Sequence, residues 1–200
     1  MSIRKNIETG ILFGLICTII LSVANFDAAC ADIKSGVLRL HIIANSDSEE
    51  DQELKLKVRD EILKNSDIIF DAATDLDTAI ACAEKNITQI TDIANKVIEN
   101  NGKDYSATAY IGNAYFETRE YDDFTLPAGE YISLIVNLGQ GEGKNWWCVV
   151  YPAVCLPAAK GELSESVGTK GVYVAEHPQK YVIRFKIIEW YESLRDRWKK

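Results

Sequence analysis

Apolar and polar positions divide the chain into an apolar N-terminal stretch, a middle part with helical periodicity and a later part with strand periodicity. Between the first two, residues 37–43 alternate, which predicts a strand with two different faces. Apolar side chains occupy one of these faces, at Leu38, Leu40 and Ile42. The other, more polar face takes Arg39, His41 and Ile43.

Two helices are predicted after this strand. Residues 49–64 carry acidic side chains in the first turn and basic ones later, an order that suits the helix dipole. Residues 76–100 place apolar side chains at alternating steps of four and three, which predicts one continuous amphipathic helix. Cys82 lies beside the apolar seam of this helix and is interpreted as a packed thiol.

From residue 105 onward the hydrophobic period becomes two. Strands are predicted over 105–118, 131–138 and 146–151, and the GQGEGKN loop of residues 139–145 is expected to join the last two as a hairpin. Residues 157–170 are interpreted as a polar loop. The resulting order, β-α-α-β-β-β-α, predicts a single α+β domain in which two or three helices pack on a mainly antiparallel sheet. Its extent is residues 32–200, with the core at about 37–158.

The first 31 residues have the three-part pattern of a secretory signal. A basic pair, Arg4 and Lys5, precedes the uncharged run 11–23, and Ala29-Cys30-Ala31 forms a small-residue cleavage site. The apolar run is about 20 Å long as a helix, short of the roughly 30 Å hydrocarbon core, although extension to Phe26 lets it span marginally. A cleaved signal peptide and an uncleaved membrane anchor therefore both stay open.

Export changes the interpretation of the cysteines. Cys148 and Cys155 bracket the VVYPAV segment, in which Pro152 is able to turn the chain back. Outside the cytoplasm such a pair can oxidise to a disulfide, and the alternative is two small buried apolar side chains. The spacing matches no zinc motif, so we expect no metal and no cofactor.

Charge is unevenly distributed. The formal net charge of −8 argues against nucleic-acid binding, which requires a basic surface. The last 21 residues are the exception, with seven basic and three acidic side chains on a predicted amphipathic helix of about 179–199. Such a helix can rest on anionic lipid or on an acidic partner, or it can be an ordinary surface helix.

The sequence contains no recognisable catalytic motif, so no catalytic residue is predicted. The GQGEGK loop lacks the serine or threonine and the following helix of a phosphate-binding loop. Acidic residues at alternate positions resemble a calcium loop, but Glu50 and Leu56 stand where glycine and glutamate are needed. His41 with Asp47 or Asp51 is the one acid–base alternative, and it leaves open an exported envelope hydrolase. A structural envelope protein is a further alternative.

Two blocks of sequence carry a family resemblance. The segment LRLHIIANSDSEEDQELKLKVRDEIL, Leu38–Leu63, resembles the signature block of stage II sporulation protein R, and GEGKNWWCVVYPAVC, Gly141–Cys155, resembles its second block. The resemblance implies a signalling protein that is secreted across the forespore membrane toward the mother cell. Its implied partner is a membrane-embedded, aspartic-type sporulation protease, which it activates to process the precursor of the mother-cell sigma factor.

The two blocks also contain the expected partner-binding residues. Polar side chains near the strand-to-helix junction are favoured, together with a tryptophan pair whose rings a strand directs to opposite faces. The expected set is Arg39, His41, Asn45, Asp47, Asp51, Lys55, Arg59, Trp146 and Trp147. The alternative for the first block is that it only caps a helix and buries a strand.

Overall fold

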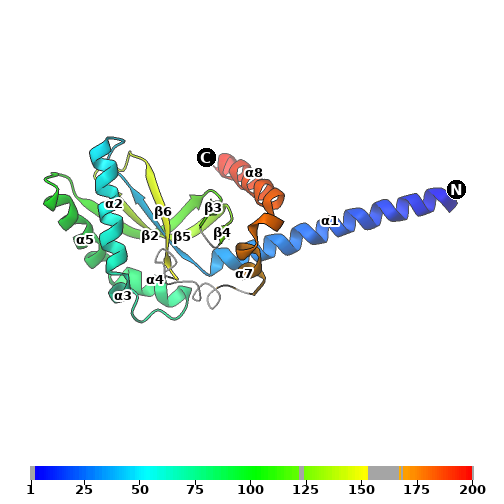
Figure 1. The fold of residues 1–200 in the computed structure, drawn as a ribbon, viewed down its shortest axis with the longest axis horizontal. Helices are drawn as coiled ribbons and strands as arrows, with labels where there is room; N and C mark the ends of the chain where they lie inside the picture. The colour runs from blue at the N-terminus through cyan, green and yellow to red at the C-terminus, as the bar shows by residue number, and fades with distance from the viewer. Residues whose placement is uncertain (1–2, 122–123, 153–166, 168, 200) are drawn as a thin grey trace.

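A four-stranded mixed sheet forms the centre of the computed structural model, which describes residues 3–121, 124–152, 167 and 169–199. In sheet order the strands are β2 (Ala107–Phe116), β5 (Gly129–Leu138), β1 (Leu38–Ile43) and β6 (Asn145–Tyr151). β1 runs parallel to β5 and antiparallel to β6, and β2 runs antiparallel to β5 (Figure 1). The predicted α+β domain is therefore confirmed.

The predicted hairpin of residues 131–151 is wrong, because β1 lies between β5 and β6. β1 supplies the fully buried Leu38, Leu40 and Ile42 to one face and the fully buried Arg39 to the other. A strand covered on both faces belongs in the middle of a sheet. The loop that follows β5 is long enough to pass over the end of β1, so β5 and β6 become next-nearest neighbours.

Four helices cover one face of the sheet: α2 (Glu49–Lys64), α3 (Ser66–Ile69), α4 (Leu76–Lys85) and α5 (Ile87–Asn100). The predicted continuous helix over 76–100 is wrong at one residue, Asn86. Its side chain donates a hydrogen bond to the carbonyl oxygen of Ile69 at 2.9 Å, which ties the break between α4 and α5 to α3. The predicted apolar seam nevertheless stays on one side, since Ala83, Ile90 and Ala94 enter the core and Leu76, Ile80, Ile87 and Val97 pack against it. Ile98, which the predicted seam did not include, is also buried.

The opposite face carries a second apolar cluster, built from chain segments at both ends of the sequence. Its elements are the ribbon of β3 (Arg119–Glu120) and β4 (Thr125–Leu126), the helices α1 (Ile3–Ser35), α7 (Thr169–Glu176) and α8 (Val182–Lys199), and a 3-10 turn at Pro178–Lys180. The ribbon and α7 were not predicted. Most of the predicted loop 157–170 lies outside the described residues, and Lys170 belongs to α7.

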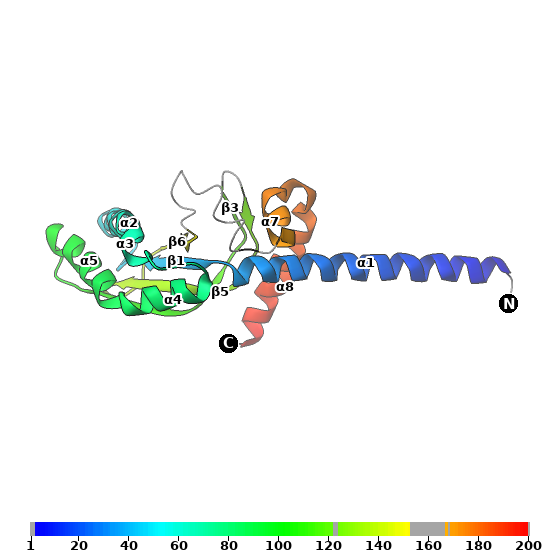
Figure 2. The same cartoon turned by 90° about the horizontal axis from the view of Figure 1, so that it is seen from below.

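The N-terminal segment forms one helix, α1, which runs past the predicted cleavage site without a break. Its first two-thirds project away from the rest of the chain, and Figure 2 shows this part without neighbours. α1 is long and apolar enough to cross a membrane, and signal sequences share these two properties. Its last turns are buried, with Phe26, Ala29, Cys30 and Ile33 packed in the second cluster. A signal or anchor segment is thus consistent with the structure.

Candidate functional site

Two loops that are distant in sequence meet where β1 and β5 end. They are residues 44–51, the β1–α2 turn with the first residues of α2, and residues 139–145, the β5–β6 loop with the first residue of β6. Together we call them the junction. The backbone N–H of Lys144 donates to Asp47 Oδ1 at 2.7 Å, and that of Gln140 donates to Asn45 Oδ1 at 3.0 Å. Two backbone bonds add further links, from Gly143 N–H to the carbonyl of Ala44 at 2.9 Å and from Glu142 N–H to the carbonyl of Asn45 at 3.3 Å.

Glycine is required where the two loops touch. Gly139 has a φ of +57°, and a Cβ built on it lies 2.2 Å from Asn45 Oδ1. At Gly143 the corresponding Cβ lies 2.2 Å from the carbonyl oxygen of Ser46. Both distances are below any permitted contact, so the GQGEGKN loop reaches the β1–α2 turn this closely because these positions carry no side chain.

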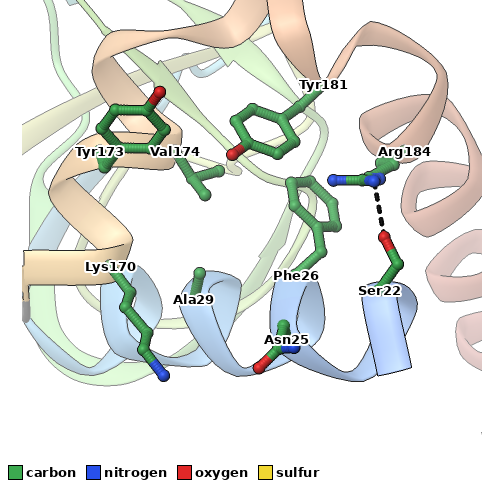
Figure 3. A pocket seen from close by; sticks show the side chains of 9 residues that line it. All are labelled: Ser22, Asn25, Phe26, Ala29, Lys170, Tyr173, Val174, Tyr181 and Arg184. Carbon is green, nitrogen blue, oxygen red and sulfur yellow. Dashed lines mark hydrogen bonds between the residues drawn. The ribbon is translucent and has the colours of Figure 1, made fainter. Parts of the chain in front are cut away.

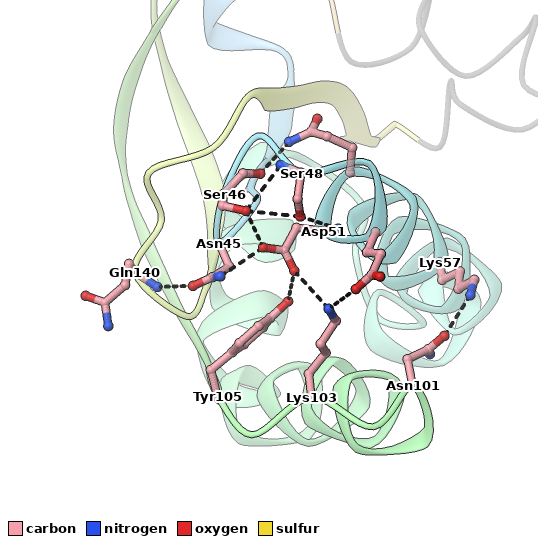
Figure 4. A network of polar contacts seen from close by, with 11 residues as sticks. Asn45, Ser46, Ser48, Asp51, Lys57, Asn101, Lys103, Tyr105 and Gln140 are labelled. Carbon is pink, nitrogen blue, oxygen red and sulfur yellow. Dashed lines mark hydrogen bonds and ion pairs between the residues drawn. The ribbon is translucent and has the colours of Figure 1, made fainter.

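A buried carboxylate organises the inner side of the junction. Asp51 is only 4% exposed, and its oxygens accept hydrogen bonds from Asn45 Nδ2 (2.9 Å), Ser46 Oγ (2.6 Å) and Tyr105 Oη (2.7 Å) (Figure 4). Lys103 Nζ lies 3.8 Å from Asp51 Oδ1. Burial alone would raise the pKa of Asp51, but these hydrogen bonds and the lysine charge lower it to about 2. The carboxylate is therefore ionised and fully engaged in holding the fold.

A buried lysine supports the junction from α2. Lys55 is 4% exposed, and its Nζ donates to the carbonyl oxygen of Lys144 at 2.8 Å and to Gln52 Oε1 at 2.6 Å. Burial lowers the pKa of Lys55, and the neighbouring Asp47 opposes this shift. Lys55 therefore links α2 to the loop before β6 from the inside.

Arg39 lies under the other face of the sheet and has no exposed surface. Its guanidinium stacks 4.0 Å from the ring centroid of Phe116 and 5.0 Å from that of Tyr131. Nη2 donates to Tyr121 Oη at 2.9 Å. Burial lowers the pKa of Arg39, and the side chain joins β1 to the β3–β4 ribbon.

His41 follows Arg39 on the same face and lies among aromatic rings. Its ring centroid is 5.9 Å from that of Phe116 and 6.1 Å from that of Trp147. Burial lowers the pKa of His41, so the imidazole is neutral at pH 7. No contact in the described part of the chain joins His41 to Asp47 or Asp51.

The rings of the tryptophan pair lie on opposite faces of the sheet, as predicted, and each packs against an apolar cluster. Trp146 packs against the helix-covered core, and Trp147 packs against the second cluster. An arginine covers each indole: Arg59 Cζ lies 4.4 Å from the centroid of Trp146, and Arg119 Cζ lies 4.5 Å from that of Trp147. Arg59 and Trp146 are both half-exposed and form one cation–π pair beside α2.

The expected partner-binding residues thus fall into three groups. Asn45, Asp47, Asp51 and Lys55 meet at the junction, Arg39, His41 and Trp147 lie on the second-cluster face, and Arg59 pairs with Trp146. Sequence reasoning missed Tyr105 and Lys103, which complete the Asp51 site from the segment between α5 and β2. No local pattern marks them, because their role depends on where the sheet places them.

Besides the junction, the cysteines and the residues that could bind a metal ion are candidates for a functional site. Cys17, Cys30 and Cys82 are free thiols, and Cys148 is nearly buried in β6. Cys155 lies outside the described residues, so the Cys148–Cys155 disulfide stays a prediction. Within the described residues, no three histidine, cysteine or acidic side chains gather closely enough to hold a metal ion.

Comparisons with known proteins match the part of the chain that holds the junction. The family model described as Stage II sporulation protein R (spore_II_R) matches residues 34–160. Stage II sporulation protein R of Bacillus subtilis (strain 168) is 35% identical over 131 residues, which cover 65% of this chain and 58% of that protein. The match thus spans less than two-thirds of the relative's length. No solved structure matches the chain.

Proposed function

This chain belongs to the stage II sporulation protein R family, and from that premise we propose that it is an exported signalling protein of sporulation. It acts by binding a membrane-embedded, aspartic-type protease and activating it toward the precursor of the mother-cell sigma factor. It performs no catalysis itself. The basic helix α8 assists by contacting the membrane in which the protease lies.

The observation that carries this proposal is the junction. The two blocks that resemble the family are separated by about 80 positions, and the two loops of the junction meet through four hydrogen bonds. The contacts position an outward rim of charged side chains on Asp47, Glu142 and Lys144, all of which are exposed. A rigid, charged rim is suited to recognising one partner, because a surface that is ordered beforehand loses little entropy on binding.

Burial divides the expected partner-binding residues by role. Arg39, Asp51 and Lys55 are inaccessible, so we assign them to holding the binding surface in shape. The contact surface is proposed to be Asp47, the Arg59–Trp146 pair and the rim of the GQGEGKN loop, with Asn45 positioned between them. Tryptophan and arginine are frequent at the energetic centres of interfaces, which favours the Arg59–Trp146 pair as the anchor.

Activation follows from differential binding. A ligand shifts a protease toward its active state only if it binds that state more tightly than the inactive one. We propose that the junction binds an extracytoplasmic part of the protease in its competent arrangement, such as an active dimer.

The alternative of an exported hydrolase finds no support in the geometry around His41. The carboxylate of Asp51 is engaged by Asn45, Ser46 and Tyr105, while the His41 ring lies among Phe116 and Trp147. A general base needs a partner within hydrogen-bond reach of the reacting proton. The described residues offer His41 no such carboxylate.

Reconstitution in cells that do not sporulate tests the proposal. The chain, the protease and the sigma-factor precursor are co-expressed, and processing of the precursor is followed by immunoblot. We expect processing only when all three are present. Its absence, with all three proteins folded and the chain exported, contradicts the proposal.

Charge reversal on the rim then tests whether the junction is the partner-binding surface. Glu142→Lys and Lys144→Glu each reverse the charge of an exposed side chain. Because like charges placed opposite each other weaken an interface, we expect each variant to reduce processing by about tenfold or more. Glu84→Lys is the matched control, because Glu84 is exposed on α4 at the other end of the sheet (Figure 1). Equal loss in the control would show that the effect is not specific to the junction.

A further inference from the structure

A cavity of about 370 Å³ lies between α1, α7 and α8, on the opposite side of the molecule from the helix-covered core. Its size falls within the range of about 300–1,000 Å³ that is usual for small-ligand sites. Three elements contribute its walls (Figure 3). The lining consists of Ser22, Asn25, Phe26, Ala29, Lys170, Tyr173, Val174, Tyr181 and Arg184.

The charged side chains that line the cavity in the described part of the chain are both basic. Lys170 and Arg184 lie at opposite ends of a row of α1 side chains (Figure 3). Lys180 adds a third positive charge nearby, since its Nζ donates to Tyr173 Oη at 2.8 Å. No carboxylate belongs to the described lining. The described lining is thus positively charged although the whole chain has a net charge of −8, and such a lining favours an anionic ligand.

Arg184 is held in place at the cavity wall. Its Nη2 donates to Ser22 Oγ at 2.6 Å, and its Cζ lies 5.2 Å from the ring centroid of Tyr181 and 5.9 Å from that of Phe26. A guanidinium has five N–H donors in a planar fork, and the bond to Ser22 uses only one. A fixed guanidinium fork matches the geometry of a phosphate group.

In a bilayer crossed by α1, the cavity would lie at the level of the phospholipid headgroups. The exposed apolar part of α1 ends at Val23, and Ser22 and Asn25 line the cavity. A hydrocarbon core of about 30 Å takes about 20 helical residues. A bilayer crossed by α1 from its basic N-terminal end therefore has its second interface at Ser22–Asn25.

The outer face of α8 supports the same placement. Phe185, Ile188 and Glu192 face inward, while Ile183, Ile187 and Trp190 are exposed, Ile183 by 76%. α8 starts beside α1 and leads away from it instead of running along it (Figures 1 and 2). An exposed apolar stripe with tryptophan and flanking basic residues is typical of helices that lie in a membrane interface.

We propose that this cavity binds the phosphate headgroup of an anionic phospholipid from the bilayer that α1 crosses. Arg184 holds the phosphate at one end of the cavity and Lys170 adds positive charge at the other end. The rings of Phe26, Tyr173 and Tyr181 surround the glycerol, and the acyl chains follow the apolar surface of α1. The site requires α1 to remain attached, because Ser22, Asn25, Phe26 and Ala29 all precede the predicted cleavage point. The proposal does not depend on the sporulation role.

Lipid binding to the full chain in a neutral detergent provides the test. Affinities are measured calorimetrically for dioctanoylphosphatidylglycerol, dioctanoylphosphatidylcholine and inorganic phosphate. We expect saturable binding of phosphatidylglycerol, at least about tenfold tighter than that of phosphatidylcholine, because only the former has a net negative charge. Equal affinity for both lipids overturns the proposal. If inorganic phosphate binds as tightly as phosphatidylglycerol, the cavity is a site for a free anion, and the proposal of a lipid ligand is overturned.

Variants locate the binding site. Arg184→Gln and Lys170→Gln should each weaken phosphatidylglycerol binding by about tenfold, whereas Lys186→Gln, on α8 but outside the cavity lining, should leave it within about twofold. If Arg184→Gln loosens α8, as judged by its thermal unfolding, Lys170→Gln decides, because Lys170 is exposed. Unchanged affinity in both cavity variants overturns the proposal.

The intact mass of the chain purified from producing cells completes the test. A mass that includes residues 22–29 is expected. A chain that begins after Ala31 lacks one wall of the cavity and also overturns the proposal. It would leave the proposed activation of the protease untouched, so the two proposals fail separately.

Discussion

The phenolic hydroxyl of Tyr105 donates a 2.7 Å hydrogen bond to the carboxylate of Asp51, a residue 54 positions earlier in the chain. The bond joins the first turn of α2 to the segment that leads into β2. Asn45 and Ser46 donate to the same carboxylate, so Asp51 links three segments that converge at the junction. The charge state of this one side chain therefore affects both stability and the shape of the proposed binding surface.

The stability of the fold should fall in acid because of Asp51. Its pKa is lowered to about 2 in the folded chain from an ordinary value of 3.8, so the ionised form favours folding. This contribution, on the order of 2 kcal/mol, is complete above about pH 5 and is lost as the pH falls toward 2. Urea unfolding at a series of pH values should show the loss, and Asp51→Asn should remove this component. An unchanged pH profile in the variant would contradict the assignment.

Arg39 should prove to be a structural residue. Arg39→Ala removes a fully buried side chain, its stacking on Phe116 and its bond to Tyr121, so we expect a loss of about 2–5 kcal/mol in unfolding free energy. Arg39→Met fills much of the same space and should cost less. Thermal unfolding of the two variants provides the measurement. Arg59→Ala is the control, and it should change the unfolding temperature little while reducing partner binding.

His41 distinguishes a ligand from an enzyme. Because its ring lies between Phe116 and Trp147, His41→Phe should keep the aromatic packing and preserve precursor processing within about threefold. His41→Ala should reduce processing only as far as it reduces the amount of folded chain. Processing relative to folded protein is the measured ratio. Complete loss of processing in a well-folded His41→Phe variant would favour the hydrolase.

The end of α1 should behave as part of the domain core. Phe26 is 4% exposed, stacks on Tyr181 at 5.3 Å and meets the ring of Phe185 at 5.2 Å. Phe26→Ala should therefore increase amide hydrogen exchange in α7 and α8, at a cost of about 3–5 kcal/mol. Phe13→Ala is the matched control on the same helix, since Phe13 is 67% exposed. Equal exchange in α7 and α8 for both variants would contradict this packing.

The junction should be sensitive to a single methyl group at Gly139. Gly139 and Gly102 both have a positive φ, of +57° and +71°, so alanine strains the backbone at either position. Only at Gly139 does the new Cβ meet a neighbour, Asn45 Oδ1, whereas nothing lies within 4 Å at Gly102. Gly139→Ala should thus reduce processing beyond its effect on stability, and Gly102→Ala should not. Similar processing in both would remove the junction from the proposed binding surface.

The local pattern of apolar and polar residues was sufficient to predict several features of this protein. The alternation in residues 37–43 placed Leu40 and Arg39 on opposite faces of a strand, and the structure confirms this, because side-chain direction in a strand depends only on the backbone period. The seam of residues 76–100 likewise placed Ala83, Ile90 and Ala94 in the core, but it missed the buried Ala79 and Ile98. The two sequence blocks gave the family, since they lie within its matched region.

Pairing and burial were decided only by the tertiary structure. The chain order suggested a hairpin between β5 and β6, but β1 lies between them because its buried side chains need cover on both faces. The same insertion brings the loop after β5 against the turn after β1, and so creates the junction. Arg39, Asp51 and Lys55 look like surface residues in the sequence. Their neighbours come from segments far along the chain, and only these neighbours make their burial possible.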